Sequence, residues 1–189
     1  MIHDQSAADE YREIAGRFTR LVEAVPDDAT WQRQSPVPEW VARDVVRHLV
    51  EWFPGFLADG AGITLPQGPD VDNDPVGAWR TMSDGVQAVL DDPASRGRVL
   101  VNPHIGEVPV PEVIARFFTA DVFMHTWDLA RATGQDETLD PERCAQLLDG
   151  MQPLDDILRS SGQYGPKVDV PDDADVQTKM LALIGRDPR

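Results

Sequence analysis

Three polar side chains, those of His48, Asp121 and His125, fall where the spacing of apolar residues calls for core side chains. Asp121 and His125 are four residues apart, so both project from the same face of one helix. His48 lies on an earlier helix, between Val45 and Trp52. A buried carboxylate costs several kcal/mol unless it is paired or bound to a metal. We therefore expect the three groups to meet in one core.

Two imidazoles and one carboxylate form a suitable ligand set for a divalent transition metal, with zinc as the first choice and nickel or iron as alternatives. Three protein ligands leave a coordination position open, which is typical of a reactive site rather than a structural one. The same residues also fit a buried hydrogen-bond cluster without a metal, because Asp-x-x-x-His pairs are common on helices. The spacing leaves both interpretations open.

Other reactive side chains are weaker candidates. Asp44 forms a second Asp-x-x-x-His pair with His48, which would suit a dinuclear site, but its place in a first helical turn favours an ordinary role at the exposed N–H groups. Glu51 has no clear inward direction. Cys144 is expected to be a small buried hydrophobe rather than a nucleophile, and His104 a solvated turn residue.

The elements that must position these groups are mostly helical, because apolar spacing near 3.6 residues dominates. We predict helices over residues 6–25, 40–57, 75–91, 111–133, 140–159 and 175–184, with Pro54 kinking or ending the second. A small hairpin is expected from residues 99–101 and 108–110. Trp52 and Trp127 are expected beside the polar cluster. The predicted class is all-α, an antiparallel four-helix bundle with a small hairpin and a short C-terminal helix.

Composition narrows the function classes. The chain has 189 residues, 17 Lys and Arg against 33 Asp and Glu, and a net charge of −16, which argues against nucleic acid and anionic membranes as partners. Neither a membrane-spanning run nor a signal peptide is visible in the sequence, and the single Cys144 excludes an internal disulfide. We expect one cytoplasmic domain over residues 1–189, either a monomer or a homodimer.

Three motifs resemble a known family. Residues 40–50 (WVARDVVRHLV) resemble the second-helix motif of the DinB-like metal-binding bundles. Residues 121–134 (DVFMHTWDLARATG) and the tail 164–188 are similar to the actinobacterial branch related to the N-terminal domain of mycothiol-dependent maleylpyruvate isomerase. The motifs occur in the same order as in that branch and extend over nearly the whole chain.

The resemblance implies a DinB-like four-helix bundle that binds a divalent metal through His48, Asp121 and His125. It also implies mycothiol as a cofactor, and a small-molecule thiol and an electrophilic substrate as partners of a metal-dependent transferase or isomerase. The isomerase has a glutamate where this chain has Asp121, so the metal geometry is expected to differ by about one methylene. The alternative function is a non-catalytic metal-binding or stress-related module.

Overall fold

A computed structural model describes residues 6–162 and 164–189 of the chain. The elements in chain order are α1 (Ala7–Glu23), α2 (Asp28–Trp31), α3 (Ala42–Ala61), α4 (Pro75–Asp91), η1 (Pro93–Gly97), β1 (Val99–Asn102), β2 (Gly106–Pro109), α5 (Val110–Val113), η2 (Ile114–Thr119), α6 (Ala120–Thr133), α7 (Pro141–Met151), η3 (Gln152–Leu154), α8 (Asp155–Ser160) and α9 (Val176–Leu183). The protein is mostly helical, which confirms the predicted all-α class.

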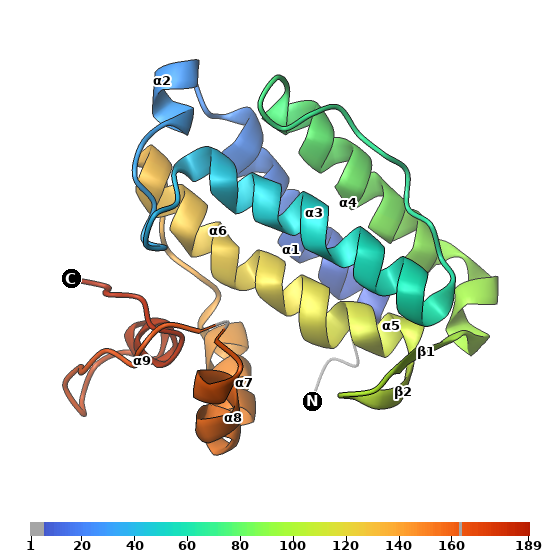
Figure 1. Cartoon of the computed structure of the whole chain (residues 1–189). Coiled ribbons are helices and arrows are strands. Elements are labelled where there is room, and N and C mark those ends of the chain that lie inside the picture. Colours follow the sequence, from blue (N-terminus) through green and yellow to red (C-terminus); the bar gives the residue numbers. More distant parts are fainter. Residues whose placement is uncertain (1–5, 163) are drawn as a thin grey trace.

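Four long helices lie side by side around the main core (Figure 1). Helix α1 packs against α4 and α6, and α3 packs against the same two helices. The strands β1 and β2 form the predicted hairpin, an antiparallel pair in which Leu100 is opposite Val108, and β1 contacts α3. The packing of α3 against α6 determines which side chains of the two sequence motifs can meet.

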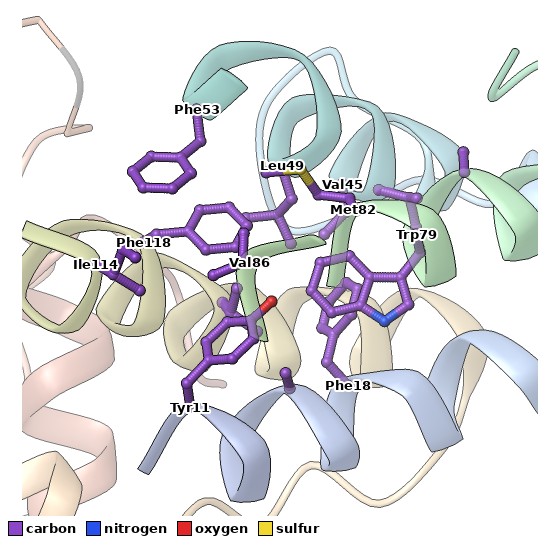
Figure 2. Packing of buried hydrophobic residues seen from close by; sticks show 14 of the residues in the cluster. Tyr11, Phe18, Val45, Leu49, Phe53, Trp79, Met82, Val86, Ile114 and Phe118 are labelled. Carbon is purple, nitrogen blue, oxygen red and sulfur yellow. The ribbon is translucent and has the colours of Figure 1, made fainter. Parts of the chain in front are cut away.

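The main core consists largely of aromatic and branched side chains, and those labelled in Figure 2 come from α1, α3, α4 and η2. Phe18 of α1 meets Trp79 of α4 with their ring centroids 4.6 Å apart. Phe53 of α3 stacks on Phe118 of η2 at 4.5 Å. The first contact joins α1 to α4, and the second joins α3 to η2, the segment that leads into α6. Close packing of these rings restricts the rotation of α3 relative to η2.

The helix starts follow from local sequence. Asp74 accepts a hydrogen bond from the backbone N–H of Gly77 at 2.8 Å, and Pro75 occupies the first helical position of α4. Asp140 caps α7 in the same way through Arg143. The predicted bounds of α4, residues 75–91, are those of the structure.

Pro54 does not end its helix, as one of the two predicted outcomes had it, because α3 continues to Ala61. An interior proline costs about 3 kcal/mol. Phe53 and Leu57 on either side are fully buried, and burial of such side chains contributes about 1.5–3 kcal/mol each. Their combined burial outweighs the lost backbone hydrogen bond.

Two other predicted helices are divided. The segment 111–133 is helical throughout, but residues Ile114–Thr119 form a π-helix, η2, directly before α6. The segment 140–159 is interrupted at η3, where Pro153 follows Gln152. The short helix α2 was not predicted and lies in the expected loop around Trp31.

A second core lies beyond the main one, between α6, α7 and α9. It buries Phe123, Met124 and Trp127 of α6 against Leu181 and Ile184 near the C-terminus. Helix α9 also packs against α7. The C-terminal segment is therefore held close to the same helix that carries Asp121 and His125.

Candidate metal centre

Helices α3 and α6 bring His48, Asp121 and His125 together. Nε2 of His48 lies 2.9 Å from Oδ2 of Asp121, and Nε2 of His125 lies 3.4 Å from Oδ1 of the same carboxylate. One ligand atom from each residue lies within 4.8 Å of the others. The carboxylate thus lies between two imidazoles that come from helices far apart in the sequence.

An indole also binds the oxygen of this carboxylate that faces His48. The Nε1–H group of Trp52, one turn after His48 on α3, donates to Oδ2 of Asp121 at 2.9 Å. Burial opposes ionisation of Asp121, but the nearby His125 and His48 outweigh it, and the pKa of the carboxyl is lower than its ordinary value. The carboxylate is therefore ionised at neutral pH, which is the form that a metal ligand requires.

The imidazole of His125 is held from both sides. Its Nδ1 lies 2.9 Å from Oδ2 of Asp128, one turn later on α6. Arg186 of the C-terminal segment donates to Asp128 twice, from Nε to Oδ1 at 2.8 Å and from Nη2 to Oδ2 at 3.0 Å. Burial lowers the pKa of His125, but the charge of Asp121 and the hydrogen bond to Asp128 raise it above its ordinary value.

Aromatic rings pack against the cluster, and an open depression borders it at His48. Trp40, just before α3, stacks on His125 with ring centroids 5.8 Å apart and lies 5.1 Å from the ring of His48. The side chain of His48 is 30% exposed, whereas that of His125 is 8% exposed. An open depression of about 490 Å³ borders His48, and its lining residues are Glu39, Trp40, Asp44, Arg47, His48 and Glu51. Small molecules can therefore approach from the His48 side.

Two carboxylates that the sequence offered as further ligands have other partners. Oδ2 of Asp44 accepts a hydrogen bond from the backbone N–H of Val41 at 2.9 Å, so this side chain caps the start of α3. Glu51 is exposed, and its Oε1 lies 3.9 Å from Nη1 of Arg47. Neither residue belongs to the group of converging ligand atoms found among the described residues.

Two other residues singled out in the sequence lie in the second core. Trp127 was expected beside the cluster, but it packs between α6 and α9 with the guanidinium of Arg131 4.5 Å from its ring centre. Cys144 is buried in the same core, and burial raises the pKa of its thiol to about 11. This environment fits the expectation of a small buried hydrophobe, since a reactive cysteine needs a lowered pKa.

Sequence reasoning missed the partners of His125. Asp128 lies on the same apolar stripe as Asp121 and His125, and its spacing of three residues from His125 was the available signal. Arg186 gave no local signal, because it lies 58 positions further along the chain than Asp128. The contact of Trp40 with the two imidazoles was not predicted either.

The donor atoms fit a divalent metal in type and spacing. Zinc binds imidazole nitrogen and carboxylate oxygen at about 2.1 Å, which places neighbouring tetrahedral ligands about 3.4 Å apart. The carboxylate oxygens of Asp121 lie 2.9 and 3.4 Å from Nε2 of His48 and His125, respectively. Small side-chain adjustments would therefore bring all three donors to bonding distance of one ion.

Comparisons with known proteins identify the family for residues 11–130 of the chain. The model of a family described as the mycothiol maleylpyruvate isomerase N-terminal domain matches residues 11–130, which include all three candidate ligands. Two uncharacterized proteins of Mycobacterium tuberculosis, from the strains CDC 1551 and H37Rv, are each 32% identical over 115 residues. The match covers 60% of this chain and 60% of each relative's length. No solved structure matches the chain significantly. Within the described residues, no helix has the length and apolar character needed to cross a bilayer.

Proposed function

The chain belongs to the mycothiol maleylpyruvate isomerase N-terminal domain family, and on this premise we propose that it is a divalent-metal-dependent enzyme of small-thiol chemistry. His48, Asp121 and His125 would hold the metal, with zinc as the first choice and nickel or iron as alternatives. Mycothiol is the proposed thiol, and the reaction is a transfer or an isomerisation of an electrophilic substrate. The observation that carries the proposal is the convergence of three ligand atoms within 4.8 Å beside an open depression.

A divalent metal bound by this set supplies a Lewis acid that lowers the pKa of a thiol or water. The chain's own residues create the conditions for that chemistry. Trp52 holds the carboxylate of Asp121 in place through its Nε1–H group. Trp40 lies against both imidazoles and forms part of the wall of the depression beside His48. The partly exposed His48 leaves the approach from the depression free for a thiol and its electrophile.

Metal content tests the ligand assignment directly. We expect protein purified without a metal-affinity tag, then dialysed against zinc, to retain one ion per chain. His125→Ala and His48→Ala should lose that ion. His104→Ala is the matched control, because His104 is exposed in the hairpin turn and should leave the content unchanged. An unchanged zinc content in His125→Ala would contradict the assignment.

Thiol binding tests the second half of the proposal. We expect mycothiol to give a calorimetric binding signal with the zinc-loaded protein and a weaker signal, or none, with chelator-treated protein. S-methylated mycothiol, which cannot form a thiolate, is the matched control and should lose the metal-dependent part of the signal. If mycothiol and glutathione both fail to bind while the zinc content is normal, the non-catalytic metal-binding module becomes the better description.

A further inference from the structure

A chain of buried polar contacts connects the C-terminal segment to His125. Asp128 is completely buried, with 0% of its side chain exposed, and it accepts two hydrogen bonds from Arg186 at 2.8 and 3.0 Å. Its Oδ2 also lies 2.9 Å from Nδ1 of His125. A buried carboxylate is costly unless its charge is paired and its oxygens accept hydrogen bonds. Arg186 and His125 meet this requirement together, so the three side chains form one unit.

This unit restricts which nitrogen of His125 is available as a ligand. A neutral imidazole, the form that binds a metal, keeps its lone pair on Nε2 when it donates Nδ1–H to a carboxylate. Nε2 of His125 is the atom that faces Asp121, at 3.4 Å from Oδ1. The contact with Asp128 therefore fixes both the tautomer and the orientation of the ring that the proposed metal site needs.

The backbone around Arg186 is itself well held. The N–H of Arg186 donates to the carbonyl of Leu181 at 2.9 Å and closes the end of α9. Gly185 has φ +83, and a Cβ added there would lie 2.8 Å from the backbone of Gly165, so the chain is packed tightly at this point. Leu181 and Ile184 are buried in the second core. Arg186 is thus presented to Asp128 from a fixed position.

We propose that Asp128 and Arg186 are positioning residues for the metal site. The C-terminal segment holds Asp128 through Arg186, and Asp128 holds His125 with Nε2 directed at the metal. This inference rests on the proposed metal site. Arg186 lies outside residues 11–130, which the family model matches. The inference therefore assigns the C-terminal segment a role in a site whose proposed ligands all lie within the matched residues.

Metal affinity measured by competition calorimetry with zinc tests the proposal in the full chain. Loss of an outer partner of a ligating histidine weakens metal affinity about 10- to 100-fold. We expect Asp128→Asn to raise the zinc Kd within that range and Arg186→Ala to raise it about 10-fold, at its lower limit. Arg186→Lys keeps the positive charge but cannot form the bidentate guanidinium–carboxylate pair with Asp128. The zinc Kd of this variant should therefore lie between the values of wild type and Arg186→Ala.

Arg131→Ala is the matched control. Arg131 also lies on α6 and also binds the C-terminal segment, through the backbone carbonyls of Asp187, Pro188 and Arg189. Neither Asp128 nor any of the three proposed ligands is among the hydrogen-bond partners of Arg131 in the described part of the chain. Its loss should therefore leave the zinc Kd within about threefold of wild type, even where it lowers thermal stability.

Nitrogen-15 NMR of the zinc-loaded histidines gives a readout that general destabilisation does not move. Wild type and Arg131→Ala should show His125 bound through Nε2 with a proton on Nδ1. Asp128→Asn should lose this single form or bind through Nδ1. Wild-type zinc affinity and tautomer in both Asp128→Asn and Arg186→Ala would overturn the inference and leave the metal site intact. Absence of zinc binding in wild type would instead overturn the proposed function.

Discussion

The hydrogen bond from Trp52 to Asp121 can be isolated by a single substitution. Trp52→Phe keeps an aromatic ring next to Phe53, Phe56 and Phe118 but removes the Nε1–H donor that lies 2.9 Å from Oδ2. A hydrogen bond to a charged group contributes about 1.5–3 kcal/mol. The free energy of unfolding at neutral pH should fall by that amount. In a chain of this size the melting temperature should fall by about 3–12 °C.

Trp40→Phe is the matched control for this prediction. The indole of Trp40 stacks on His125 in the same cluster, but in the described part of the chain its N–H donates no hydrogen bond. The substitution should therefore cost less than about 1 kcal/mol. Thermal and urea unfolding of chelator-treated protein, followed by far-UV circular dichroism, would compare the two variants without a contribution from bound metal.

The effect of Trp52→Phe should depend on pH with a definite sign. Burial opposes ionisation of Asp121, but the histidines and the indole lower the pKa of its carboxyl in the folded protein. A lowered pKa gives stability that is complete above the unfolded-state value of about 3.9 and is lost as the pH falls through the folded-state value. The difference between wild type and Trp52→Phe should shrink below about pH 4. Equal losses in the two Trp→Phe variants, or a constant deficit down to acid pH, would refute this reasoning.

Three further predictions concern reactivity, packing and metal linkage. Burial raises the pKa of the Cys144 thiol from 9.0 to about 11. At pH 8 the thiol should therefore react with Ellman's reagent about 100-fold more slowly in the folded chain than in the urea-unfolded chain. Similar rates in the two states would contradict its burial. Gly185→Ala should lower the melting temperature more than Gly162→Ala. Both glycines have positive φ, but only at Gly185 would an added Cβ lie 2.8 Å from the backbone of Gly165. Equal losses in the two variants would exclude that contact as the cause. Zinc at about 100 times its Kd should stabilise wild type by about 2.7 kcal/mol, seen as a higher melting temperature, and an equal shift in His125→Ala would place the ion elsewhere.

Much of the candidate site was predictable because its residues interrupt an apolar pattern. Asp121 and His125 share a helix face by their spacing, and His48 stands on the inward face of another helix. Their convergence needed only that the two helices pack against each other, which is the ordinary result in an all-α chain. The role of these residues as metal ligands stays a prediction, as does the assignment of residues 1–189 to one domain.

Contacts between distant segments were not predictable in the same way. No pattern around Arg186 indicates that its guanidinium will reach Asp128, because that pairing depends on how α9 packs in the second core. The same holds for the indoles. Sequence position suggested Trp127 near the cluster, but the direction of each ring follows from its helix rotation, and Trp40 lies on the imidazoles instead.

Helix interruptions were misjudged where local and tertiary effects compete. A helix ends just before Pro153, where Gln152 and Leu154 are exposed. The helix continues through Pro54, where Phe53 and Leu57 are buried in the main core. The π-helix Ile114–Thr119 could not be predicted from the spacing of apolar residues. Ile114 and Phe118 are four residues apart and both buried, which is also the pattern of an ordinary α-helix.

The position of that π-helix, directly before the helix that carries Asp121, bears on how the family can vary in length. A π turn contains one residue more than an α turn, because its hydrogen bonds run from i to i+5 rather than i+4. Removing one residue within Ile114–Thr119 would let the segment tighten into ordinary α-helix while the flanking residues keep their places. The stretch between Asp121 and His125 is ordinary α-helix and has no extra residue to lose. Removing one residue there would turn one side chain about 100° away from the other. Relatives that keep this site should therefore tolerate a one-residue gap before the aspartate and none between the aspartate and the histidine.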